Sequence, residues 1–73
     1  MMGESEQQVL EIFGRHLLIR KDELRRIFNE NGLNDGVAAV SKLNDLGYLK
    51  MVDSVGSICY TITQNGMRAL RSV

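Results

Sequence analysis

Basic side chains gather in one short stretch of the chain, where their spacing suits contact with phosphate groups. The four bases are Arg20, Lys21, Arg25 and Arg26. Lysine and arginine side chains that contact phosphates release counterions, and the resulting affinity falls as salt rises. Three acids share the stretch, namely Asp22, Glu23 and Glu30. The sequence therefore leaves two interpretations open: a phosphate clamp, or a solvated helix face whose charges compensate one another.

Residues suited to catalysis or metal binding are few. The chain has one histidine, His16, and one cysteine, Cys59, which together cannot supply the four ligands of a structural zinc site. No Ser/His/Asp set has a recognisable spacing, and the glycines do not follow a strand in the order that a dinucleotide site requires. We expect no enzyme activity, no metal and no cofactor. His16 is expected to be a polar turn residue and Cys59 a packed strand residue.

Length and charge balance narrow the class of protein further. The chain has 73 residues, of which 44% are hydrophobic and 25% charged, as expected for one small globular domain over residues 1–73. Nine basic residues balance nine acidic ones, which argues against binding nucleic acid by overall charge alone. The apolar runs reach about four residues, as in 37–40, too short for a membrane span. We expect a cytoplasmic domain without a membrane partner.

The first element that must support these side chains is a helix. Ser5, with Gln8 three residues later, has the form of a capping box and predicts the helix start. Apolar residues then recur at helical spacing, namely Val9, Leu10, Ile12 and Phe13. Gly14 is expected to end the helix. Residues 17–19 are too few for another helix and are predicted to form a short buried extended segment.

Two further helices are predicted on either side of a tight turn. The first covers residues 21–30, and its apolar stripe comprises Leu24, Ile27 and Phe28. Gly32 is expected to end it, with Leu33 tucked against the core. Asn34 is a suitable N-cap for the second of these helices, over residues 35–46. Two helices joined so closely indicate a helix-turn-helix.

The helix over residues 35–46 is expected to bury one side and expose the other. The side predicted to cover the core comprises Val37, Ala39, Val40, Leu43 and Leu46. The exposed side comprises Ala38, Ser41, Lys42 and Asp45. Small side chains such as Ala38 and Ser41 would allow a close approach to a DNA groove, although ordinary exposed helix residues would show the same pattern.

The apolar period then changes from helical to alternating. Residues 48–52 and 58–62 read as two strands, joined by turn-forming residues at 53–57 into a β-hairpin. Thr63 is predicted to cap a last short helix that carries Met67, Ala69 and Leu70. Because an isolated hairpin is marginally stable, residues 17–19 are expected to add a third strand. The expected fold class is α+β.

The segment from Leu43 to Leu70, LNDLGYLKMVDSVGSICYTITQNGMRAL, resembles the winged-helix (winged helix-turn-helix) DNA-binding domains of prokaryotes. It is similar to MarR-type and PadR-type regulators and to small archaeal winged-helix proteins. The resemblance implies a three-helix winged helix-turn-helix with a β-hairpin wing and a short C-terminal helix. It also implies that helix 35–46 enters the DNA major groove.

The resemblance further implies which residues touch double-stranded DNA. Base edges or backbone would be met by Ala38, Ser41, Lys42 and Asp45 of the third helix. Phosphates would be met by Lys21, Arg25 and Arg26, beside the neighbouring Arg20 of the basic stretch. The wing would contribute Lys50 and Ser54.

Two functions follow as hypotheses. The first is a DNA-binding transcriptional regulator, acting as a homodimer that reads two half-sites because one copy carries few bases. The alternative is a winged-helix protein–protein interaction module of a larger transcription or replication assembly. Zero net charge and the acidic character of the third helix favour the alternative.

Overall fold

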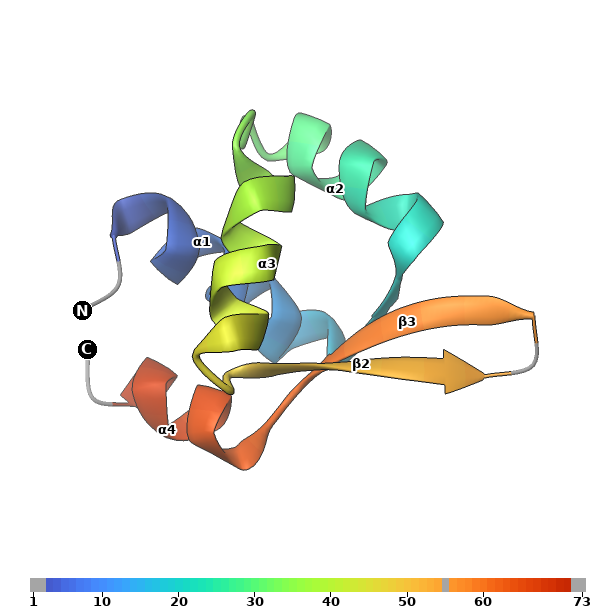
Figure 1. Cartoon of the computed structure of the whole chain (residues 1–73). Helices are drawn as coiled ribbons and strands as arrows, with labels where there is room; N and C mark the ends of the chain where they lie inside the picture. Colours follow the sequence, from blue (N-terminus) through green and yellow to red (C-terminus); the bar gives the residue numbers. More distant parts are fainter. Residues whose placement is uncertain (1–2, 55, 72–73) are drawn as a thin grey trace.

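The computed structural model describes residues 3–54 and 56–71, with the backbone alone at residue 54. The elements, in chain order, are α1 (Glu4–His16), β1 (Leu18–Arg20), the 3-10 turn η1 (Lys21–Glu23), α2 (Leu24–Glu30), α3 (Gly36–Asp45), β2 (Leu49–Ser54), β3 (Ser57–Ile62) and α4 (Gln64–Arg71). Figure 1 shows the helices at one end and the β2–β3 hairpin projecting from the other. The predicted α+β class is confirmed.

The three strands form one antiparallel sheet in the order β1-β3-β2. Ile19 of β1 lies opposite Tyr60 of β3, which in turn lies opposite Met51 of β2. The predicted third strand is therefore confirmed. The prediction that residues 17–19 are buried was wrong for two of them, because Ile19 is buried whereas Leu17 and Leu18 are both 55% exposed.

The hairpin strands are longer than predicted. Asp53 lies opposite Ile58 and Ser54 opposite Ser57, so the five-residue turn expected at 53–57 was wrong. Positions 55 and 56 separate the end of β2 from the start of β3, and Gly56 has a φ of 76°. Two-residue connections with a positive φ suit the right-handed twist of paired strands, which explains why pairing continues to the tip.

The core lies between α1, α2, α3 and one face of the sheet. Its largest fully buried side chains are Phe13, Phe28, Leu10, Leu43 and Val9. Ile19 and Leu49 contribute from the sheet. Cys59 is also buried, but its register partners are Arg20 and Val52, which places it on the opposite sheet face from Ile19. Cys59 is therefore a packed strand residue, as expected from the sequence.

The ends of α1 differ from the prediction. Ser5 is not the cap: Gly3 precedes the helix, and its backbone N–H donates to the Glu6 carboxylate at 3.1 Å. The helix also does not end at Gly14 but continues to His16, which is an exposed terminal helical residue and not a turn residue. Gly14 lies within the helix, and the end of the Leu70 side chain of α4 lies close to where its Cβ would be.

The α2–α3 turn follows the prediction in outline. Residues 21–30 are η1 and α2, Gly32 has a φ of 70°, and Leu33 packs on the core. The predicted Asn34 cap was wrong, since Asp35 precedes α3 and makes no side-chain capping bond. The helix accordingly covers Gly36–Asp45, slightly less than the predicted 35–46.

The buried side of α3 is rotated from the predicted one. It comprises Gly36, Ala39, Val40 and Leu43. Val37 and Leu46 were predicted to cover the core, but they are 54% and 44% exposed. The reason is a close approach between helices: Gly36 lies directly against the Phe28 ring, where an added Cβ would overlap it. Because of this contact, α3 is turned so that Gly36, and not Val37, lies against α2.

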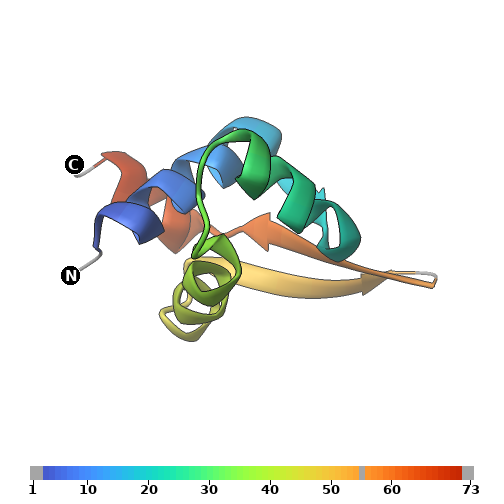
Figure 2. The same cartoon turned by 90° about the horizontal axis from the view of Figure 1, so that it is seen from above.

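The predicted cap of α4 is confirmed. The backbone N–H of Gly66 donates to Thr63 Oγ1 at 3.1 Å, and the Thr63 hydroxyl donates to the Gly47 carbonyl at 2.6 Å. The backbone N–H of Thr63 also donates to the Tyr48 carbonyl at 3.0 Å. One threonine thus joins the exit of α3 to the start of α4. Viewed from above, α4 lies beside α1, away from the hairpin tip (Figure 2).

Candidate nucleic-acid interface

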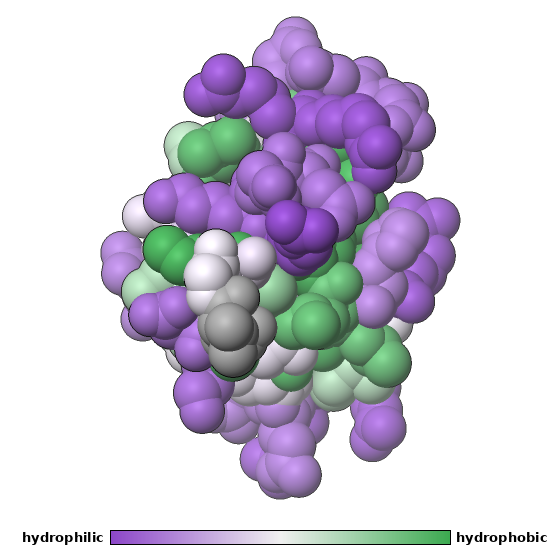
Figure 3. Space-filling view, turned by 90° about the vertical axis from the view of Figure 1, so that its right-hand side faces the viewer, coloured by the Kyte–Doolittle hydropathy of each residue, from purple (hydrophilic) through white to green (hydrophobic). Residues whose placement is uncertain are grey.

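An open groove of about 620 Å³ runs between the start of α2 and the outer end of the hairpin. One wall carries Arg20, Lys21, Asp22 and Arg25, and the other carries Gly56, Ser57 and Ile58. In Figure 3, which faces the hairpin end, hydrophilic surface covers the upper part of the molecule, apolar surface crosses the middle, and further hydrophilic surface lies at the bottom. The groove is therefore polar on the helical wall and partly apolar on the hairpin wall.

The sheet register brings these distant segments together. Arg20 ends β1 opposite Cys59 of β3, so the chain leaves the sheet beside the outer half of the hairpin. The η1 turn follows at once and leads into α2. The basic stretch is consequently held against residues 56–58, more than thirty positions later in the chain.

The bases on the groove wall differ in their partners. Arg20 Nη2 lies 3.4 Å from Asp22 Oδ2, and both side chains are more than half exposed. Within residues 3–54 and 56–71, no ion pair engages Lys21 or Arg25. An exposed pair such as Arg20–Asp22 contributes little stability and exchanges readily with solvent. The three bases and one acid give the wall a formal charge of +2.

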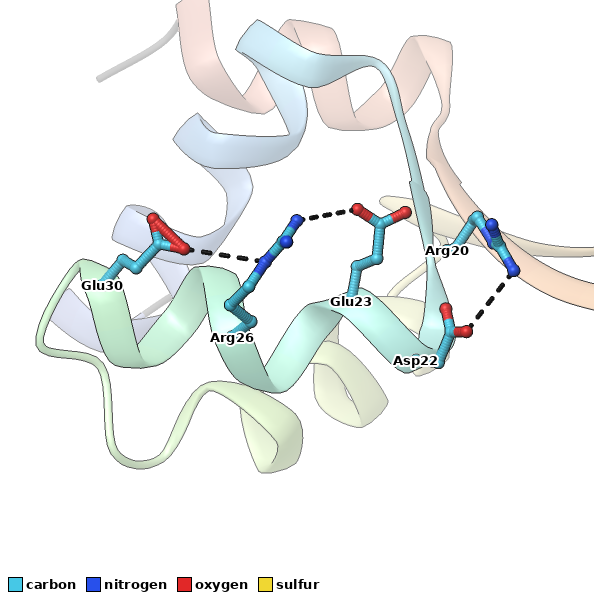
Figure 4. A network of polar contacts seen from close by, with 5 residues as sticks. All are labelled: Arg20, Asp22, Glu23, Arg26 and Glu30. Carbon is cyan, nitrogen blue, oxygen red and sulfur yellow. Dashed lines mark hydrogen bonds and ion pairs between the residues drawn. The ribbon is translucent and has the colours of Figure 1, made fainter.

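The positive charge of Arg26, in contrast, is compensated by two acids of the same segment. Its guanidinium pairs with Glu23 at 3.0 Å and with Glu30 at 3.7 Å, one turn away on either side (Figure 4). Figure 4 also shows Arg20 and Asp22 as a separate pair at the beginning of the helix. The two interpretations of the basic stretch thus apply to different residues. The charge of Arg26 is compensated by neighbouring acids, whereas Lys21 and Arg25 are available to contact phosphates.

The predicted contact face of α3 is exposed. Ala38, Ser41 and Asp45 all lie on the side away from the core. Lys42 is exposed as well, but its Nζ lies 3.0 Å from the Glu6 carboxylate of α1. The hydrogen bond from Lys42, followed by the one from the Gly3 backbone, lowers the pKa of the Glu6 carboxyl. Lys42 therefore joins α3 to α1 and does not extend freely toward a ligand.

Of the two predicted wing residues, Lys50 does not line the groove. Lys50 is exposed and lies opposite Thr61, with β3 between it and β1. Ser54 is the last residue of β2, and its side chain lies outside the described atoms. The structure thus brings Arg20, Lys21 and Arg25 together at the hairpin and leaves Arg26, Lys42 and Lys50 elsewhere.

Sequence reasoning missed the hairpin wall of the groove. Ser57 and Ile58 were assigned to the turn and to the start of the second strand, because the predicted turn was too long. Ile58 and Met51 share the core-facing side of the sheet with Leu49, but they extend past the helices and are 37% and 52% exposed. The glycine at position 56 was the available signal for a tighter hairpin.

Other kinds of site are not evident in the described residues. Across residues 3–54 and 56–71, no three His, Cys, Asp or Glu side chains gather closely enough to hold a metal ion. In the same part of the chain, no helix has both the length and the apolar character needed to cross a bilayer. No protein-family model, curated protein or solved structure matches the chain.

Proposed function

We propose that the protein is a winged-helix DNA-binding protein that acts as a transcriptional regulator. The support is the order of its elements: three helices, with α2 and α3 joined by a tight turn, then a hairpin in the position of a wing. A short strand after α1 completes the sheet. DNA would lie against the exposed face of α3 with the hairpin beside it, as in other helix-turn-helix proteins.

One observation carries the proposal. Lys21 and Arg25 are unpaired among the described residues and face a groove that the hairpin closes on its other side. In Figure 1 the start of α2 and the hairpin tip lie on one side of the molecule, and the chain ends lie on the other. Cations so placed can contact phosphates without any net positive charge on the whole chain.

The test is an NMR titration of the 15N-labelled chain with duplex DNA at low salt. We expect the amide signals of residues 20–25, residues 56–58 and the exposed face of α3 to shift together. Signals of α4 should stay in place and serve as the internal control. The proposal is wrong if no amide of η1, α2, α3 or the hairpin moves at any DNA concentration.

A homodimer remains part of the proposal. One copy places few unpaired bases in the groove, so two copies bound to one duplex would add their phosphate contacts. Sedimentation of the protein with and without duplex DNA measures the stoichiometry. Two chains per duplex are expected, and a single chain per duplex at saturation would remove the dimer from the proposal.

A second function is favoured by exposed apolar side chains on α3 and on the hairpin, of which Ile58 lines the groove. Val37, Met51 and Ile58 are 54%, 52% and 37% exposed. Apolar side chains of this size are more typical of protein contacts than of DNA contacts. A protein-interaction module would lose its partner in a Met51→Ser/Ile58→Ser variant and keep it in a Lys21→Gln/Arg25→Gln variant. The opposite pattern, measured with DNA, supports the first function.

A further inference from the structure

The exposed face of α3 is poorly equipped to distinguish base pairs. In helix-turn-helix proteins, the residues toward the N-terminus of the second helix contact base edges. The most discriminating contacts are bidentate ones, from Arg or Lys to guanine and from Asn or Gln to adenine. Residues 36–41 contain none of these four types. Lys42, the next residue, is held by Glu6 at 3.0 Å.

The residues that do face solvent there make weaker distinctions. Ala38 and Val37 can touch a thymine methyl group, and the Ser41 hydroxyl can bond to more than one base. Asp45 is acidic and lies in the last turn of the helix. An acid repels nearby phosphates, so it limits how closely that end of α3 can approach the backbone. Direct base readout by the N-terminal part of this helix is therefore slight, and the exposed Asn44 lies in its last turn.

Two cations that have no ion pair among the described residues lie instead in the groove, where they could reach backbone phosphates. Lys21 and Arg25 line the groove, and Arg20 joins them if a phosphate displaces Asp22, which lies at the long distance of 3.4 Å. Contacts to phosphates fix the position of a protein on the duplex but carry no direct sequence information. The groove geometry and the composition of α3 thus both favour contacts to the phosphate backbone over contacts to base edges.

We infer that the chain binds duplex DNA chiefly through its phosphate backbone, in the groove between α2 and the hairpin, with little discrimination between sequences. This inference rests on the proposed function and specifies its ligand as the duplex backbone. A regulator of this kind would act by covering DNA broadly. It would not select one operator.

Salt dependence and sequence dependence together test the inference. Affinity of the full chain is measured by fluorescence anisotropy, over a series of salt concentrations, on several duplexes of equal length and unrelated sequence. Three phosphate contacts predict a slope of log K against log salt of about −2.7 per bound chain, because each contact contributes about −0.9. Affinities for the different duplexes are expected to agree within about tenfold, the effect of roughly one good bidentate base contact.

Two variants locate the contacts. The Lys21→Gln/Arg25→Gln chain should bind more weakly, with a slope near −0.9. Arg26→Gln is the matched control: it makes the same chemical change at the adjacent position of the same helix, where the side chain is already paired with Glu23 and Glu30. It should leave the slope unchanged. Circular dichroism melting of both variants checks that they fold.

The possible outcomes separate the inference from the function on which it rests. A strong preference for one duplex, well above tenfold, would overturn backbone-only binding while leaving DNA binding intact. An unchanged slope in the double variant would overturn the groove as the site. Failure of the unmodified chain to bind any duplex at low salt would overturn the proposed function and this inference together.

Discussion

The hydroxyl group of Thr63 links the exit of α3 to the start of α4. Thr63 Oγ1 accepts the Gly66 backbone N–H and its hydroxyl donates to the Gly47 carbonyl. Removing the hydroxyl leaves the first turn of α4 without its cap and the Gly47 carbonyl without this donor. Both losses act on backbone groups that must otherwise find water.

We therefore expect Thr63→Ala to lower the free energy of unfolding by about 1 to 2 kcal/mol, the usual cost of a lost N-cap. Urea denaturation followed by circular dichroism measures the change. Thr63→Ser is the control because it keeps the hydroxyl, and it should lose less than half as much. Equal losses in the two variants would show that the methyl group and not the hydroxyl matters.

The carboxylate of Glu6 gives the chain a pH-dependent contribution to stability. Its pKa is lowered in the folded state, first by the hydrogen bond from Lys42 and then by the Gly3 backbone N–H. A folded pKa below the unfolded one means that the stabilisation is complete above the unfolded pKa. It is lost as the pH falls through the folded pKa.

Glu6→Gln should accordingly be less stable than the unmodified chain at neutral pH, and the difference should shrink as the solution is acidified. Thermal melting of both chains across the acidic range gives the comparison. Glu4→Gln is the control, since Glu4 lies in the same first turn. A difference that stayed constant with pH would show that the Glu6 carboxylate is not the titrating group.

At the scale of elements, the contact between α2 and α3 depends on the lack of a side chain at Gly36. The Phe28 ring occupies the space that a Cβ would need. Gly14 offers a contrast: it lies within α1, and the atom nearest to an added Cβ is Leu70 Cδ1, the end of a flexible side chain. The same substitution should thus have different effects at the two positions.

Gly36→Ala is expected to lower the free energy of unfolding by about 1 to 3 kcal/mol, as overpacking of a core usually does. Gly14→Ala should be close to neutral, since alanine gains up to about 1 kcal/mol in helix propensity while Leu70 moves aside. Chemical denaturation of both variants measures this. A Gly36→Ala chain as stable as the unmodified one would mean that the helices separate without cost.

Local patterns predicted the elements better than their contacts. The stripe of Leu24, Ile27 and Phe28 and the cap at Thr63 are encoded within a few residues, and both were confirmed. The rotation of α3 was missed because it is set by Gly36 meeting Phe28, across a turn. The strand ends at 54 and 57 depend on pairing between strands, which local turn propensity describes poorly.

In the candidate site, too, some features follow from the local sequence and others depend on contacts made in the folded chain. Arg26 has acids three residues before it and four after it, a spacing that favours helix ion pairs and could have separated it from Arg25. That Arg25 faces a groove required the register of β1 on β3, which brings residues 56–58 to it. The attachment of Lys42 to Glu6 likewise depends on how α1 crosses α3.

For the molecule as a whole, the position of charge matters more than its sum. The formal charge is zero, yet the groove wall carries +2. The acids of α1 compensate that excess without lying in the groove. A local change in charge should therefore affect DNA binding more than the same change elsewhere.

Asp22→Asn tests this statement because it removes the acid from the groove and releases Arg20. On the proposed function, it should bind duplex DNA more tightly than the unmodified chain, because Arg20 no longer has to leave Asp22 and the groove loses an acid that repels phosphates. Glu11→Gln changes the net charge equally but lies on α1, beside α4, and should have little effect. Equal effects of the two variants in anisotropy measurements would favour overall charge over local charge.

The strand order has a further consequence for how copies of the chain behave at high concentration. Since β3 is central, the outer side of β2 presents its amide and carbonyl groups to solvent, as in any terminal strand of an open sheet. Such borders tend to recruit strands from neighbouring molecules unless charges deter them. Lys50 and Asp53 supply one charge of each sign on either side of the exposed Met51. Neutralising both Lys50 and Asp53 would leave β2 as an uncharged six-residue strand edge, to which strands of further copies could pair and form a filament.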